Sequence, residues 1–167
     1  MKFIHPVTQS EVFSHWEKVE KISIFNRIDI VFPLVAYNDL VWNIVEIETA
    51  DINKLYICSS DDWSAEGLCI PDFKVVTAVE NYKKSDYSTG KFADIKAKED
   101  ILTKDIDGLD TKLIIVSDNP NGPFTLIEGC KRSVALGNLG KLVSLKVYLG
   151  VSPAIKTYIW ARYMYGR

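Results

Sequence analysis

A run of six residues in the last third of the chain combines most of the reactive groups that this sequence places close together. A carboxylate, a thiol, two cations and a hydroxyl surround one glycine in Glu128, Gly129, Cys130, Lys131, Arg132 and Ser133. Glycine lets a chain turn tightly and leaves room for a ligand to approach the backbone. A helix that begins after it presents outward-pointing amides and a partial positive charge, which favour an anion. Two bases at that helix start call for a compensating anion, so the segment predicts a phosphate-binding site.

Each of these side chains also has a plainer interpretation. A strand–glycine–helix corner with surface cations is common among domains, and the chain has no GxxxxGK[ST] phosphate loop here. Glu128 is a candidate general base or magnesium ligand, or else a solvated or capping glutamate. Cys130 is a candidate nucleophile, because a helix start beside two cations lowers a thiol pKa. Cysteine is also among the residues most often buried, and a structural role is the favoured interpretation.

The elements on either side of this corner are the clearest in the sequence. The continuous apolar run 112–117 predicts a buried strand, and 118–123 (Asp-Asn-Pro-Asn-Gly-Pro) predicts a turn. A second strand is expected at 124–127, a helix at 133–139 and a returning strand at 143–149. These elements hold the corner between buried strands.

The remainder of the chain predicts several more helices and strands. A capping box formed by Thr8 and Glu11 begins a helix over 9–20, on which His15 is expected to lie at the surface. The composition of 28–60 indicates strands, with 41–48 and 54–58 joined by a hairpin connection at 49–53. Loop is expected at 59–64. Helices are expected at 71–83 and 92–106, the latter ending at Asp107-Gly108, and a final helix follows Ser152-Pro153.

Residues 124–136 (FTLIEGCKRSVAL) resemble the second signature box of the ParB/sulfiredoxin superfamily. In that box a strand leads into Gly-x-x-Arg and a helix with alanine three residues after the arginine, as at Gly129, Arg132 and Ala135. The Gly-Cys-Lys-Arg stretch is similar to the Gly-Cys-His-Arg of sulfiredoxins. The resemblance covers about residues 92–150. It does not include the first ParB signature, which is not recognisable in 96–105.

The resemblance implies a role for each residue of the corner. Arg132 would bind a nucleotide phosphate in a forked manner, and the amides of Cys130 and Lys131, together with Ser133, would surround the anion. Lys131 would stand where sulfiredoxins have a phosphate-contacting histidine, and Cys130 where they have their nucleophile. The expected ligand is ATP or CTP with Mg²⁺.

Size and composition limit the remaining possibilities. A chain of 167 residues fits one domain, which we divide into a strand-rich N-terminal portion (1–91), the ParB/sulfiredoxin-like core (92–150) and a C-terminal helix (151–167). A net charge of −2 gives no support to nucleic-acid binding. Three widely spaced cysteines form neither a disulfide framework nor a zinc site. Without a signal peptide or a long apolar run, a cytoplasmic location is expected.

The sequence therefore predicts an α+β fold, with a mixed sheet and flanking helices, and leaves two functions open. One is a nucleotide-binding protein, with nucleotide hydrolysis or phosphoryl transfer as its expected activity. The other is a non-catalytic regulatory protein that uses the same fold and binds a protein partner through the N-terminal half.

Overall fold

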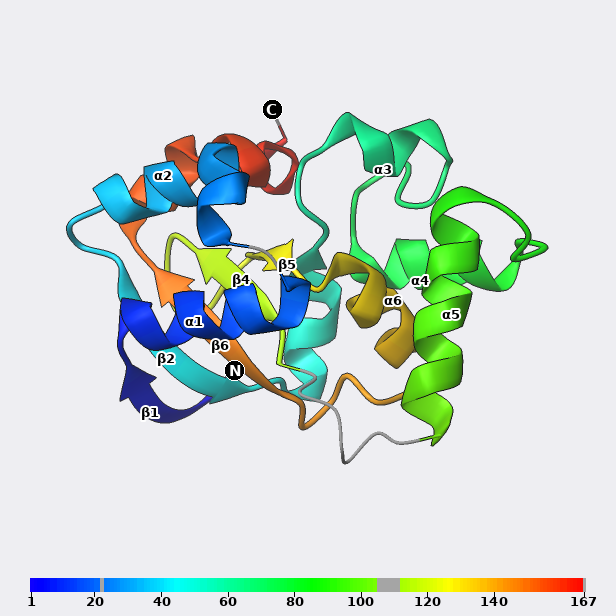
Figure 1. Ribbon diagram of the computed structural model, residues 1–167, viewed down its shortest axis with the longest axis horizontal. Coiled ribbons are helices and arrows are strands. Elements are labelled where there is room, and N and C mark those ends of the chain that lie inside the picture. The colour runs from blue at the N-terminus through cyan, green and yellow to red at the C-terminus, as the bar shows by residue number, and fades with distance from the viewer. Residues whose placement is uncertain (22, 105–111, 167) are drawn as a thin grey trace.

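A six-stranded mixed sheet forms the centre of the computed structural model, which describes residues 1–21, 23–104 and 112–166 (Figure 1). The strands lie in the order β1-β2-β6-β4-β5-β3. Neighbours pair antiparallel except for β4 with β6 and β3 with β5, which pair parallel. The strand bounds are β1 Lys2–Val7, β2 Val41–Glu46, β3 Leu55–Tyr56, β4 Ile114–Ser117, β5 Phe124–Glu128 and β6 Lys146–Val151. An α+β fold with a mixed sheet and flanking helices is thus confirmed.

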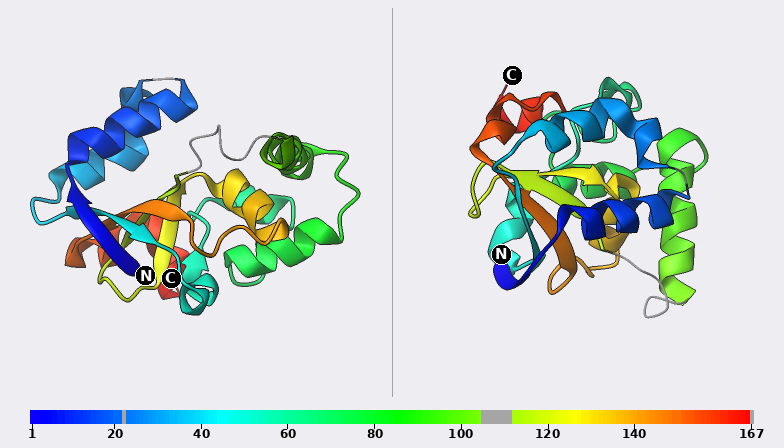
Figure 2. Two further views of the ribbon diagram at one scale, coloured as in Figure 1. Left: turned by 90° about the horizontal axis from the view of Figure 1, so that it is seen from below. Right: turned by 60° about the vertical axis from the view of Figure 1, so that its left-hand side comes forward.

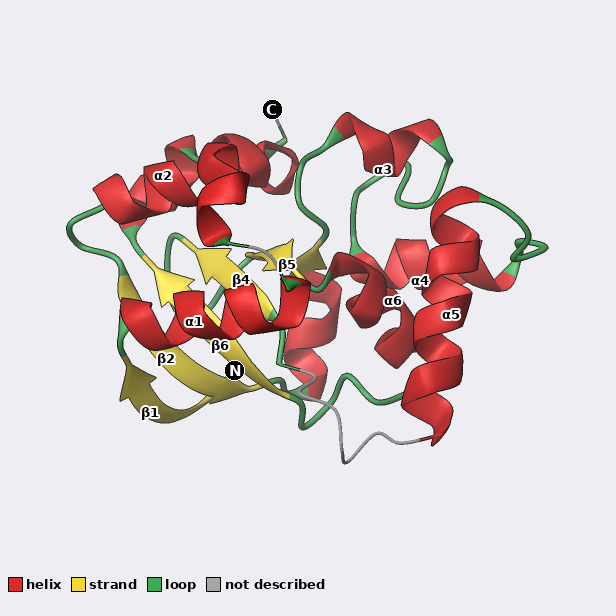
Figure 3. Cartoon of the chain, viewed as in Figure 1, coloured by secondary structure: helices red, strands yellow, loops and turns green. Residues whose placement is uncertain are grey.

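Helices cover both faces of this sheet (Figures 2 and 3). One face packs against α1, α2, η3 and η4, and the other against α4, α5 and α6. The helix bounds are α1 Gln9–Glu20, η1 Ile24–Arg27, α2 Ile28–Ala36, η2 Thr49–Lys54, α3 Asp61–Ala65, α4 Val75–Lys83, α5 Gly90–Lys104, α6 Cys130–Asn138, η3 Pro153–Thr157 and η4 Ile159–Tyr165, where η marks a 3₁₀ helix.

Alternation along β4 shows why the centre of the sheet is apolar throughout. Ile114 and Val116 belong to the core beneath α1 and α2, whereas Leu113 and Ile115 belong to the core beneath α6. All four side chains are fully buried. A strand that is buried on both faces reads as a continuous apolar run, as 112–117 does.

Several elements confirm their predictions closely. The helix over 9–20 is present, and its capping box is complete, because Thr8 and Glu11 bond each other's backbone amides. The strands around the turn at 118–123 pair as an antiparallel hairpin. The helix predicted at 92–106 is observed as α5, and its expected end at Asp107-Gly108 lies outside the described residues.

The prediction of strand structure for 28–36 is wrong, because this segment is helix α2. Its apolar residues suit either structure by composition. In the helix, Val31 and Leu34 are buried against the core, while Ile28, Phe32 and Val35 are half or more exposed. Tertiary packing therefore overrides the β-branched composition.

The predicted hairpin at 49–53 is also wrong. Residues 49–54 form η2, in which Asp51 accepts a bond from the Glu48 amide and pairs with the N-terminal ammonium of Met1 at 2.9 Å. β3 consequently pairs with β5 at the far edge of the sheet rather than with β2.

Three helix boundaries differ from expectation. α4 begins at Val75 rather than at 71, because Phe73 adopts a positive φ of 59° that a helix does not allow. The segment 59–64, expected to be loop, contains the short helix α3. The predicted final helix is divided into η3 and η4 at Tyr158, which is extended.

Among the described residues, no helix has both the length and the apolar character needed to cross a membrane.

Two neighbouring residues of α5 test how this helix packs. Leu102 is 3% exposed and Ile101 is 51% exposed. We expect Leu102→Ala to lower the free energy of unfolding by about 3 kcal/mol, because it leaves a cavity in the core. Ile101→Ala is expected to change it by less than about 0.5 kcal/mol beyond its helix-propensity effect. Urea denaturation measures both, and equal losses would contradict the assigned packing.

Candidate functional site

The strand–glycine–helix corner that the sequence predicts is present at the junction of β5 and α6. Gly129 is the N-cap of α6 with φ +86°, and no side chain caps the helix. A Cβ at this position would lie 2.5 Å from Leu113 Cδ2 and 3.2 Å from Arg132 Nη2. Glycine is therefore required both by the backbone conformation and by the close approach of two side chains.

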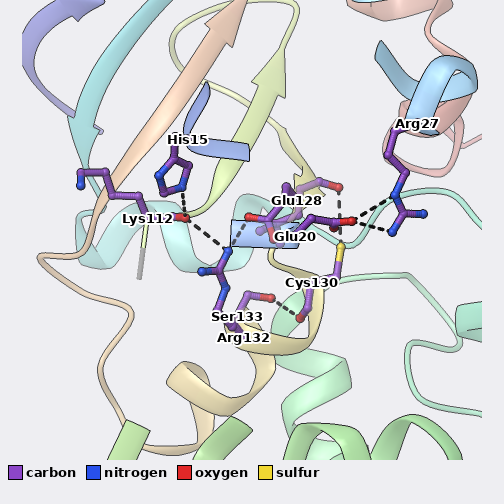
Figure 4. A network of polar contacts seen from close by, with 9 residues as sticks. His15, Glu20, Arg27, Lys112, Glu128, Cys130, Arg132 and Ser133 are labelled. Atoms are coloured by element: carbon purple, nitrogen blue, oxygen red, sulfur yellow. Dashed lines mark hydrogen bonds and ion pairs between the residues drawn. The ribbon is translucent and has the colours of Figure 1, made fainter. Parts of the chain in front are cut away.

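Arg132 reaches back over this glycine to the end of the preceding strand (Figure 4). Its Nη2 donates to Glu128 Oε2 and lies 3.4 Å from the carbonyl oxygen of Lys112. Both charged side chains are largely buried, with exposed fractions of 12% for Arg132 and 6% for Glu128. The anion that the sequence requires beside Arg132 is thus supplied by the protein itself.

The second cation of the corner is also paired. Lys131 Nζ contacts the carboxylate of Asp94 on α5, and both side chains are partly exposed. The pair borders an open hollow of about 260 Å³ between α5 and α6, lined by Asp94, Ala97, Lys98, Ile101 and Lys131. Exposed pairs of this kind contribute at most about 1 kcal/mol, so Lys131 exchanges partners easily.

Glu128 has an unusual charge state for a carboxyl beside an arginine. Burial has the largest effect and raises its pKa, the charge of Arg132 lowers it, and the charge of Glu20 raises it, so that the pKa lies at about 7. The loss of hydration therefore outweighs the attraction of the guanidinium. Near neutral pH, a large fraction of Glu128 is therefore protonated, and it then accepts the hydrogen bond from Arg132 as a neutral carboxyl.

Helix α1 closes this network from the other side of the sheet (Figure 4). His15 Nε2 lies 3.2 Å from the Lys112 carbonyl oxygen, the same atom that Arg132 approaches. At the end of α1, Glu20 accepts two bonds from Arg27, at 3.1 and 2.8 Å. The carbonyl group of Lys112, two residues before β4, is thus the meeting point of side chains from α1 and α6.

The expectation that His15 is a surface residue is wrong, because it is 7% exposed. Its ring lies 5.0 Å from that of Tyr148 in β6. His15 follows the buried Val12 by three positions, so helical spacing alone would have placed it on the inner face. No local pattern indicates its contact with Lys112, which is 97 residues away in the chain.

Cys130 and Ser133 are both turned inward. Cys130 Sγ lies 3.8 Å from Cys58 Sγ, and the hydrogen bond it donates there, together with burial, raises the pKa of the Cys130 thiol well above its usual value. Ser133 is fully buried, and its hydroxyl donates to the Cys130 carbonyl oxygen at 2.8 Å. The Cys130 thiol thus contacts a second cysteine in the core, and the Ser133 hydroxyl is bonded within its own helix.

The described part of the chain brings together no group of three or more His, Cys, Asp or Glu residues that would hold a metal ion. Of the residues predicted for the site, Glu128, Gly129 and Arg132 meet in one place, and Lys131 faces the adjoining hollow. A magnesium ion bound through Glu128 stays a prediction.

Comparison with known proteins gives no relative for this chain. No family model, no curated protein and no solved structure matches it significantly. The resemblance of residues 92–150 to the ParB/sulfiredoxin superfamily consequently remains a prediction from the sequence.

The raised pKa of Glu128 predicts a specific pH dependence of stability. A glutamate in the unfolded chain titrates near ~4.3, so between that pH and about 7 the folded state holds more protons than the unfolded state. The stability that neutral Glu128 contributes is complete below about pH 4.3 and is lost as the pH rises through about 7. From these two pKa values the loss is at most about 4 kcal/mol.

Urea denaturation between about pH 4 and about pH 8.5, a range that includes both pKa values, measures this loss. Glu128→Gln is the control, because its uncharged amide cannot titrate. We expect its stability to depend less on pH than that of the unsubstituted chain. Identical pH profiles for the two proteins would contradict a raised pKa at Glu128.

Proposed function

We propose that this chain is a nucleotide-binding protein that holds phosphate oxygens at the corner formed by Gly129–Arg132. In this proposal the Glu128 carboxyl is bonded to the Arg132 guanidinium when no ligand is bound, and a phosphate group takes its place. The ligand class is ATP or CTP with Mg²⁺, as the resemblance of the corner implies.

One observation carries the proposal: the Arg132 guanidinium lies over Gly129 at the start of α6, where no side chain caps the helix. A guanidinium in a site of low polarity requires a hydrogen-bonded anion. Burial raises the pKa of Glu128 to about 7, so this carboxyl is a weak competitor for Arg132. A phosphate group offers several charged oxygens and matches the fork of the guanidinium.

The surroundings of Arg132 favour the same ligand. α6 has nine residues and begins at a glycine without a side-chain cap, so the amides of its first turn are directed toward the corner. The hollow beside Lys131 is also lined by Lys98, whose positive charge would favour further phosphate groups of the ligand. The proposal concerns binding, and hydrolysis or phosphoryl transfer is a separate property to be assayed.

Thermal denaturation with ATP, CTP, GTP and inorganic triphosphate, each with and without Mg²⁺, tests the proposal. A ligand present at about 100 times its Kd stabilises the folded state by about 2.7 kcal/mol. For a chain of this size, the melting temperature would then rise by about 5–10 °C. We expect Arg132→Ala to remove this shift.

The control is Arg162→Ala, which breaks an arginine–carboxylate pair with Asp61 far from the corner in sequence. It should keep the full shift. Glu128→Gln should bind triphosphate more tightly, by up to about tenfold at pH 8, because no carboxylate then competes for Arg132. An absence of stabilisation by all four compounds would overturn the proposal, whereas stabilisation without phosphate release would establish a binding protein without turnover.

A second candidate function is protein binding, which the exposed face of α2 favours. Ile28, Phe32 and Val35 follow one another at i, i+4 and i+7, and all are half or more exposed. The neighbouring η4 exposes Ile159 and is joined to α2 by the bond from Trp160 Nε1 to the Asp29 carbonyl. A second copy of the chain is the partner we propose, with the apolar face of one copy packed against the same face of the other about a twofold axis.

Sedimentation velocity over a range of concentrations tests this dimer. Phe32→Ser should shift the chain toward the monomer. Phe3→Ser is the matched control, because Phe3 is exposed to a similar degree on β1 and should leave the association unchanged. An unsubstituted chain that is monomeric at high micromolar concentration would contradict the proposed self-association.

A further inference from the structure

Two cysteines that are 72 positions apart in the sequence lie side by side in the core. Cys58 belongs to the segment between β3 and α3, and Cys130 is the first residue of α6. Both are free thiols, and their sulfur atoms are 3.8 Å apart. Each residue keeps a small exposed fraction, 9% for Cys58 and 8% for Cys130, whereas Cys69 has none.

We propose that Cys58 and Cys130 form an oxidation site, at which a hydroperoxide converts the two thiols into an intramolecular disulfide while Cys69 remains reduced. This inference does not depend on nucleotide binding at the corner.

The bonding around the pair assigns a role to each sulfur. The hydrogen bond from Cys130 lowers the pKa of Cys58, so Cys58 is the better source of thiolate. Its thiolate attacks one peroxide oxygen, the O–O bond breaks, and the leaving hydroxide takes up the displaced proton as water. Cys58 is then a sulfenic acid.

The second step closes the bridge. Cys130 sulfur attacks Cys58 sulfur, the S–O bond breaks, and the hydroxyl leaves with the Cys130 proton as a second water. Two thiols and one hydroperoxide thus give one disulfide and, with hydrogen peroxide as the oxidant, two waters. Each cysteine is oxidised by one electron, and the peroxide is reduced by two.

The geometry places the sulfurs of Cys58 and Cys130 close enough to pair after a small movement. A disulfide bond is about 2.05 Å long, so the sulfurs must approach by roughly 1.8 Å. Cys58 is held in place by its neighbour, because the Ser59 amide donates to the Trp160 carbonyl at 2.7 Å and the Ser59 hydroxyl accepts from the Tyr163 amide at 2.9 Å. Cys69 has no exposed surface, and burial raises its pKa to about 12, so it is a poorer source of thiolate than Cys58.

Thiol counting on the folded chain tests the proposal. The reduced protein is treated with hydrogen peroxide, unfolded in the presence of N-ethylmaleimide, and analysed by intact mass. We expect the number of alkylated thiols to fall from three to one. Trypsin leaves Cys58 and Cys69 in one peptide, 55–74, so additional cleavage before Asp61 is needed to identify a Cys58–Cys130 bridge.

Three variants make the assignment specific. Cys69→Ala should still lose two thiols, whereas Cys58→Ser and Cys130→Ser should form no intramolecular bridge. Retention of three thiols under peroxide, a bridge that includes Cys69, or disulfides between chains would each overturn the proposal. A bridge that forms only in the urea-unfolded chain would also count against it, because the proposal rests on the folded arrangement.

Discussion

The ion pair between Glu128 and Arg132 is the interaction on which the corner depends. A buried guanidinium and a buried carboxyl stabilise each other only when both are well hydrogen-bonded, since each has lost its hydration. Here the loss prevails for the carboxyl, whose pKa rises to about 7. The pair holds Arg132 over Gly129, and under the proposed function a phosphate group displaces the carboxyl.

Elements from several parts of the chain meet at that pair. The strand β5 ends at Glu128, Gly129 gives the turn, and α6 returns Arg132 to the same place. The Lys112 carbonyl oxygen, just before β4, lies within hydrogen-bond distance of both Arg132 Nη2 and His15 Nε2. This carbonyl group therefore connects α1 to the corner on the other face of the sheet. Cys130 stands one residue after the glycine and contacts Cys58, which brings a thiol pair into the first turn of the same helix.

The sequence indicates the secondary structure of this arrangement, and it does not indicate the contacts between residues that are far apart in the chain. The strands at 112–117 and 124–127, the turn between them and the glycine corner follow from patterns within a few residues. The partners of the two cations do not follow from such patterns. The contact of Arg132 with Glu128 depends on how α6 turns back toward β5, and the contact of Lys131 with Asp94 joins two different helices. The helix at 28–36 was missed because its apolar composition suits strands as well, and only packing decides between them.

The most direct test of this account is the pKa of Glu128 itself. Carbon-13 NMR of the side-chain carboxyl, assigned by its absence in Glu128→Gln, follows that group alone through a pH titration. We expect a midpoint near 7 in the chain without ligand. A midpoint near ~4.3, the ordinary value for glutamate, would show that Arg132 holds a fully ionised partner and would contradict the exchange of carboxylate for phosphate.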